Sequence, residues 1–167
     1  MTTMFISASI IIISVLIALM MVRKEVIHCR ELDECISMIK ETGERASRYS
    51  ESFSDIMKYY NDVGKYKKIN ISSAFIKHLQ IVSPPEAWKS ALSESCMSLY
   101  QWEKDILENY ADKMFSCPLE QIEKHSNDAI SKLTDFRENA KEKRNKTTKT
   151  NAICTVSAGL MIALLIL

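Results

Sequence analysis

The chain has 167 residues, which is room for one domain, and its 22 Lys and Arg residues nearly balance its 21 Asp and Glu residues. This balance argues against nucleic acid as a partner, because nucleic-acid-binding surfaces are strongly basic. Only three glycines and three prolines occur, and so few helix breakers favour long helices over strands. We therefore expect an all-α fold of long, antiparallel, kinked helices. Every charge lies between Arg23 and Lys149, so both ends of the chain are apolar.

The first apolar end, residues 1–22, has the length of a membrane-spanning helix. It lacks a basic leading region and a good cleavage motif, which favours a retained transmembrane helix over a cleaved signal peptide. Arg23, Lys24 and Arg30 follow it, and basic flanks prefer the cytoplasmic side of a membrane. We therefore expect a membrane protein whose central domain faces the cytoplasm, in a membrane that the pattern does not identify.

The charged middle, residues 23–150, predicts a helical coiled-coil domain. After one gap of seven residues from Ile39, apolar residues recur at spacings of three and four as far as Val63, as on one helix face, and this first helix should end near Lys68. The breaker Ser83-Pro84-Pro85 marks a turn, after which a second helix should begin. Pro118 interrupts the second helix and predicts a kink.

The two predicted helices present an apolar seam, through which we expect the chain to associate with itself or with a helix of a partner protein. Trp88 and Trp102 are expected to pack between helices rather than to bind bases or ligands. The seam residues are Ile39, Tyr49, Phe53, Ile56, Tyr60, Leu99, Ile106, Leu119, Ile122, Leu133 and Phe136.

The second apolar end, residues 151–167, is shorter than the first and includes Gly159, so it is marginal as a membrane span. A C-terminal anchor in a thin membrane, or a shallow insertion, suits its length. The alternative is a truncated or alternatively spliced product, in which the apolar tail replaces a longer domain.

Basic residues gather in two clusters, one at the far end of the first predicted helix and one before the C-terminal apolar run. Each Lys or Arg close to an anionic membrane surface contributes about 1 kcal/mol to the free energy of binding. An ordinary solvated charged face is the alternative for both clusters. The predicted lipid-binding residues are Lys65, Lys67, Lys68, Lys132, Arg137, Lys141, Lys143, Arg144, Lys146 and Lys149.

No catalytic or cofactor-binding motif occurs in the sequence. The chain has no dinucleotide-binding, P-loop, nucleophile-elbow or zinc-protease pattern. His28, His78 and His125 are far apart in the sequence, which favours isolated histidines over a metal site. The five cysteines include no CxxC pair, which favours free thiols over a disulfide framework or a zinc site. We expect a protein that is not an enzyme and that has no cofactor and no metal.

Two segments resemble BAR domains. Ile106-Leu107-Glu108-Asn109-Tyr110-Ala111, followed by Cys117-Pro118-Leu119-Glu120, is similar to their second helix, which runs into a Pro-Leu step and then a Lys- and Glu-rich stretch. Ile39-Lys40-Glu41-Thr42-Gly43-Glu44 is similar to a part of their first helix. The resemblance covers residues 32–146 and is to the BAR domains of oligophrenin-like Rho GTPase-activating proteins and of related Arf GTPase-activating proteins.

The BAR resemblance implies an antiparallel helical bundle that dimerises and binds or bends anionic membranes. A BAR protomer has three long helices, whereas this chain supplies two and its apolar tail stands where the third would begin. The main hypothesis is therefore a membrane-anchored, BAR-like, self-associating protein. The alternatives are a membrane-anchored tether or adaptor that binds a helix of a partner protein, and a truncated fragment of a larger BAR protein.

Overall fold

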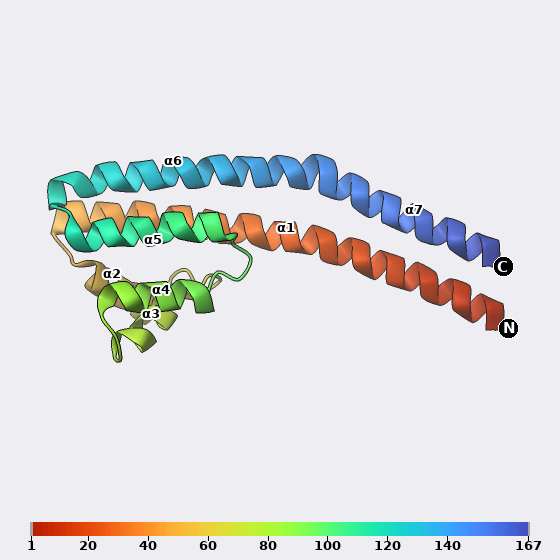
Figure 1. Ribbon diagram of the computed structural model, residues 1–167, viewed down its shortest axis with the longest axis horizontal. Helices are drawn as coiled ribbons and strands as arrows, with labels where there is room; N and C mark the ends of the chain where they lie inside the picture. The colour runs from red at the N-terminus through yellow and green to blue at the C-terminus, as the bar shows by residue number, and fades with distance from the viewer. Residues whose placement is uncertain (1, 167) are drawn as a thin grey trace. The chain divides into compact units, whose positions relative to one another are not determined.

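The computed structural model describes residues 2–166, and these are helical with connecting turns and no strand, which confirms the predicted all-α class. Figure 1 shows the helices in chain order. Their bounds are α1 Thr2–Tyr49, α2 Phe53–Val63, α3 Ile71–Leu79, α4 Pro84–Glu94, α5 Gln101–Ser116, α6 Leu119–Lys143, a π-helix η1 Arg144–Thr148, and α7 Lys149–Ile166.

The first long helix ends at Tyr49, so the prediction that it runs to Lys68 is wrong. Ser50 has a positive φ of 56°, which turns the chain out of helical geometry. Ser52 then caps α2, because its Oγ accepts a hydrogen bond from the backbone N–H of Asp55 at 3.2 Å. The apolar spacing continues across this break, and spacing alone could not reveal it.

The segment predicted as the second helix also divides. It begins at Pro84, where the carboxylate of Glu86 accepts hydrogen bonds from the Ser83 backbone N–H at 3.4 Å and from its Oγ at 2.9 Å. Helix α4 ends at Glu94, and α5 begins only at Gln101 after a loop in which Cys96 has a φ of 48°.

The predicted kink at Pro118 is a reversal of the chain. Helix α5 ends at Ser116, α6 begins at Leu119, and the two run antiparallel in Figure 1. The Oγ of Ser126 on α6 donates to the hydroxyl of Tyr110 on α5 at 3.4 Å, as expected for facing positions of a helical hairpin. A proline removes a helical hydrogen bond, and here the chain uses that position to turn back.

The chain divides into two compact units. We call residues 1–29 with 138–167 the membrane unit, and residues 30–137 the helical unit. The contacts within each unit define it, whereas the expected division at residues 22 and 150 was drawn from hydropathy and stays a prediction.

Two long helical segments, Phe5–Tyr49 and Leu119–Leu165, are candidate membrane spans, and only 17% of the apolar window in each is buried. Helix α7 has 18 residues because it begins at Lys149, so it extends about 27 Å, close to the thickness of a hydrocarbon core. The two helices approach closely: the Oγ of Ser7 donates to the carbonyl of Ala163 at 3.2 Å. A Cβ on Gly159 would lie 2.1 Å from the Oγ of Ser14.

The helical unit is built around an aromatic cluster. The ring of Phe53 lies 5.0 Å from the ring of Trp88, 5.0 Å from that of Phe115 and 5.9 Å from that of Phe75, all edge to face. Trp88 is 1% exposed, and its indole N–H donates to the carbonyl of Leu107 at 3.1 Å. The cluster thereby joins α2, α3, α4 and α5 into one core, and the prediction that Trp88 packs between helices is confirmed.

Helix α1 meets α6 at a glycine. A Cβ on Gly43 would lie 2.4 Å from the Oγ of Ser126 and 2.8 Å from its Cβ, closer than packed atoms come. Because Gly43 has no Cβ, α1 can approach α6 this closely. Beside it the hydroxyl of Tyr110 donates to the carbonyl of Ile39 at 3.4 Å, so the contact is both close and polar.

We expect Gly43→Ala to destabilise the protein by about 1–3 kcal/mol, because the new methyl group forces α1 and α6 apart. The measurement is urea unfolding of the full chain in mild detergent, followed by circular dichroism. Ser126→Gly in the same chain should recover most of the loss, since it removes both atoms that the methyl group meets. A helix glycine with open space beside it would give the opposite sign, so stabilisation by Gly43→Ala would contradict the contact.

Candidate functional site

The described residues contain no group of three or more His, Cys, Asp or Glu side chains that could hold a metal ion. The histidines make local contacts instead. His78 lies 2.8 Å from a carboxylate oxygen of Glu94, and the Nε2 of His125 lies 3.7 Å from the Sγ of Cys117. None of the five cysteines forms a disulfide within the described part of the chain. The absence of enzyme activity stays a prediction.

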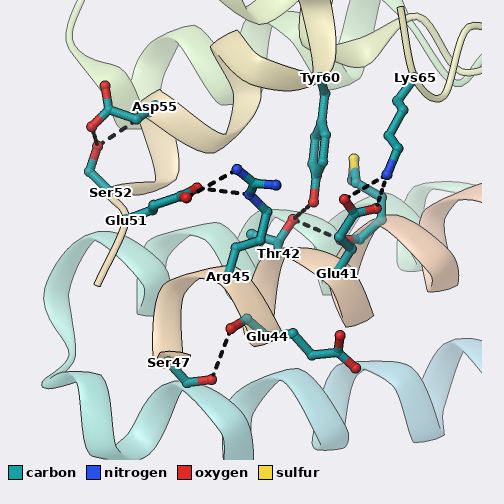
Figure 2. A network of polar contacts seen from close by, with 11 residues as sticks. Glu41, Thr42, Glu44, Arg45, Ser47, Glu51, Ser52, Asp55, Tyr60 and Lys65 are labelled. Atoms are coloured by element: carbon teal, nitrogen blue, oxygen red, sulfur yellow. Dashed lines mark hydrogen bonds and ion pairs between the residues drawn. The ribbon is translucent and has the colours of Figure 1, made fainter. Parts of the chain in front are cut away.

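A network of polar contacts holds the end of α1 against α2 (Figure 2). The guanidinium of Arg45 donates to both carboxylate oxygens of Glu51, at 2.8 and 3.0 Å, and lies 3.8 Å from the centre of the Tyr59 ring. The hydroxyls of Thr42 and Tyr60 are 3.2 Å apart in the buried part of the interface. Burial raises the pKa of Tyr60, so its hydroxyl stays protonated and available for this bond. These contacts account for the sharp turn between α1 and α2.

The predicted basic cluster at residues 65–68 takes part in the same interface. The Nζ of Lys65 donates to both carboxylate oxygens of Glu41, at 2.7 and 2.8 Å (Figure 2). Partial burial by itself raises the pKa of Glu41, but the hydrogen bonds from Lys65 and Tyr66 outweigh it, and the net pKa lies below the usual value. Lys68 pairs with Glu34 at 3.3 Å. Two of the three cations are therefore engaged within the helical unit.

Of the other predicted lipid-binding residues, some also pair with a carboxylate and some do not. Arg137 pairs with Asp33 at 2.8 Å, Lys143 with Glu25 at 3.6 Å and Lys146 with Glu142 at 2.6 Å. Among the predicted lipid-binding residues, those with no carboxylate within 4.0 Å in the described residues 2–166 are Lys67, Lys132, Lys141, Arg144 and Lys149. Lipid contact by any of these residues stays a prediction.

Most of the predicted seam lies inside the helical unit. Ile106 and Phe136 are partly exposed, and Tyr49 and Leu119 are exposed. The buried members, Ile39, Phe53, Ile56, Tyr60, Leu99, Ile122 and Leu133, pack within this chain. Self-association through the seam stays a prediction, for which only the four accessible side chains are available without unfolding.

The loop between α4 and α5 and the first turn of α5 present large apolar side chains to solvent. Met97 is 84% exposed and Trp102 is 53% exposed. The rings of Tyr100 and Trp102 stack with their centroids 4.7 Å apart and their planes 13° from parallel. We call Met97, Tyr100 and Trp102 the loop surface. The prediction that Trp102 packs between helices is wrong, because its side chain lies mainly in solvent.

Buried contacts hold the loop surface in place. Cys96 and Leu99 point into the core with 3% and 6% of their surface exposed, on either side of the protruding Met97. The backbone N–H of Ser98 donates to the carboxylate of Glu31 on α1 at 3.1 Å. The backbone N–H of Tyr100 donates to the carboxylate of Glu103 at 2.8 Å. These contacts hold the backbone of the loop between α4 and α5 in one conformation.

The sequence contains one indication of this surface. Trp102 shares a helix face with Asp105 and Asn109, which are exposed, whereas Leu107 and Tyr110 define the buried face. A tryptophan on the polar face of an amphipathic helix is unusual in a soluble unit and favours a role in binding. Met97 has no comparable indication, because it lies in a loop with no periodicity.

A family model described as stage III sporulation protein AB matches residues 3–167. The chain belongs to the stage III sporulation protein AB family. Comparison with curated proteins and with solved structures found no match. Membership of the stage III sporulation protein AB family and the two candidate spans together indicate a membrane-associated protein.

Membership of the stage III sporulation protein AB family overturns the BAR resemblance and the membrane-shaping function that it implied. The physical reason for the false resemblance is visible in the fold. The motif around Pro118 lies at a hairpin between α5 and α6, and the segment around Gly43 is a close contact with Ser126. The family match also includes residues 151–167, so the apolar tail belongs to the family's pattern and does not replace a third BAR helix.

Proposed function

We propose that this protein is a membrane-anchored, non-catalytic adaptor that docks a partner protein within a multiprotein assembly of sporulation. Three observations support the proposal. The family is named for a stage of sporulation, apolar candidate spans lie in both end regions of the chain, and the helical unit between them presents the loop surface. The loop surface carries the proposal, since it is the feature of the helical unit that most resembles a binding site.

The chemistry of the loop surface suits a protein partner. Tryptophan, tyrosine and methionine are enriched at the centres of protein interfaces, and tryptophan and tyrosine dominate the residues whose removal weakens binding most. The stacked rings of Tyr100 and Trp102 are already ordered, so binding loses little side-chain entropy. The hydrogen bonds at Ser98 and Tyr100 hold the backbone in the same way.

The helical unit is proposed to face the cytoplasm. Arg23 and Lys24 follow the first apolar segment, and Lys141, Lys143 and Arg144 precede the second. Basic residues flanking a span are retained on the cytoplasmic side, so both flanks support one orientation. The partner would then be a cytoplasmic protein or the cytoplasmic part of another membrane protein.

The experiment uses the full chain in sporulating cells, with a photo-crosslinking residue in place of Met97. We expect a crosslink to another sporulation protein, identified by mass spectrometry. Trp102→Ala should weaken the crosslink and the yield of spores about tenfold or more, since an aromatic residue at an interface centre contributes about 2 kcal/mol or more.

The matched control is Ile81→Ala, which truncates another exposed apolar side chain of the helical unit, in the α3–α4 turn. It should leave the crosslink and the spore yield at the level of the unmodified protein. The proposal fails if Trp102→Ala has no effect, if Ile81→Ala has an equal one, or if the crosslink joins only two copies of this chain.

A further inference from the structure

The membrane unit contains an apolar groove between α1 and α7. Its volume is about 320 Å³, in the range of sites that hold small molecules, and its lining is almost entirely apolar. Val15, Ala18 and Val22 line it on α1, and Ala152 and Val156 line it on α7. Because alanine side chains are short, Ala18 and Ala152 leave space between helices that meet closely at Ser14 and Gly159.

Two cations, Lys149 and Arg23, lie next to the lining residues in the sequence, at the same end of the two helices. Lys149 lies three, four and seven residues before the lining residues Ala152, Ile153 and Val156, so it shares their helix face. Arg23 directly follows the lining residue Val22. Both side chains are exposed, and neither has a carboxylate within 4.0 Å among residues 2–166.

The carboxylates nearest to Arg23 and Lys149 in the sequence form ion pairs with other lysines. Glu25, one turn beyond Val22, pairs with Lys143 at 3.6 Å, and Glu142 pairs with Lys146 at 2.6 Å. The π-helix Arg144–Thr148 ends directly before Lys149. Such segments change the direction in which the following residues point and are frequent at functional sites. Lys149 and Arg23 therefore remain exposed cations beside the groove lining, with no carboxylate partner among residues 2–166.

We propose that the groove binds one anionic phospholipid, with an acyl chain between α1 and α7 and the phosphate at Lys149 and Arg23. The apolar lining matches the acyl chain of such a lipid, and the unpaired cations match its phosphate. In a bilayer the acyl chain lies in the hydrocarbon core and the phosphate at its edge, which is the same order. An apolar helix of another protein would fill the groove but would leave Lys149 without an anion. The site holds a single lipid inside the membrane unit, independently of the loop surface and of its partner.

The test uses the full chain reconstituted in nanodiscs that contain equal amounts of phosphatidylglycerol and phosphatidylcholine. Native mass spectrometry of the released protein then counts the retained lipids. We expect one phosphatidylglycerol per chain, and Lys149→Gln should lower its retention about fivefold, which corresponds to about 1 kcal/mol for one cation. Ala152→Phe should abolish retention by filling the groove.

Matched controls lie outside the groove. Lys141→Gln removes another exposed cation without a carboxylate partner, and Ala158→Phe enlarges an exposed position of α7 that does not line the groove. Both should retain phosphatidylglycerol as the unmodified protein does, and circular dichroism should show equal helix content in all variants. Equal retention of phosphatidylcholine, an unchanged Lys149→Gln protein, or an equal effect of Ala158→Phe would overturn the proposal. Displacement of the lipid by equimolar oleate would assign the groove to a fatty acid instead and would overturn it as well.

Discussion

Replacing Trp88 by alanine is expected to destabilise the protein by about 3–5 kcal/mol, which is a large part of the stability of a domain of this size. The indole is 1% exposed and packs edge to face against Phe53 and Phe75, with ring centroids at 5.0 and 6.1 Å. Alanine would leave a cavity where α2, α3 and α4 meet. It would also remove the donor that the carbonyl of Leu107 accepts.

The measurement is the free energy of unfolding by urea, for the full chain in mild detergent, followed by circular dichroism. Trp88→Phe should cost less, because it keeps an aromatic ring in the cluster and loses the N–H donor. Trp102→Ala is the matched control: it truncates the same residue type at an exposed position and should change the stability by about 0.5 kcal/mol or less. If both alanine variants were equally stable, the aromatic cluster would not be the core of the helical unit.

Replacing Gly159 by leucine is expected to separate the two helices of the membrane unit. A Cβ at this position would already lie 2.1 Å from the Oγ of Ser14 and 2.6 Å from its Cβ. Helices in a membrane associate through packing and hydrogen bonds of small residues, since lipid supplies no hydrophobic force between them. A leucine would remove the close approach and, with it, the hydrogen bond from Ser7 to Ala163.

Disulfide crosslinking measures this separation in reconstituted vesicles. Cysteines replace Ser7 and Ala163 in a chain whose five native cysteines are substituted, and an oxidant is added. The pair should crosslink efficiently with Gly159 present and at least about tenfold more slowly with leucine, because positions 7 and 163 no longer lie close together. Ala158→Leu, at an exposed neighbouring position, should leave the crosslink unchanged, and Ser14→Gly together with Gly159→Ala should retain it. Undiminished crosslinking of the leucine variant would show that the helices do not depend on this contact.

The apolar spacing found the core residues of α2 but not the helix itself. Phe53, Ile56 and Tyr60 are buried, as members of an apolar face should be. Tyr49 and Val63 fit the same spacing and are exposed. Apolar spacing indicates which residues share a helix face. Here the spacing of α1 and that of α2 happen to be in register, so the pattern continues across the turn at Ser50 although the helix does not. A positive φ at a serine leaves no trace in hydropathy, so the end of α1 could not be found in this way.

The candidate sites were predictable only in part. The basic residues near the membrane were identified from their order in the chain, and Lys149 is among them. That Lys149 shares a helix face with residues that line a groove, whereas Lys65 is engaged by Glu41, depends on which helices pack together. Met97 is exposed because Cys96 and Leu99 are drawn into the core on either side of it, and both belong to a loop without periodicity.

The sequence by itself determined the all-α class, the two apolar ends and the charged middle between them. These properties depend on local hydropathy, charge and the scarcity of glycine and proline, which any short window of the chain carries. Only the tertiary structure decided that Pro118 reverses the chain, that Gly43 and Gly159 are contact points, and that Trp102 faces solvent while Trp88 forms the core. Each of these depends on a partner far away in the chain, because packing and hydrogen bonding are satisfied between helices and not within one.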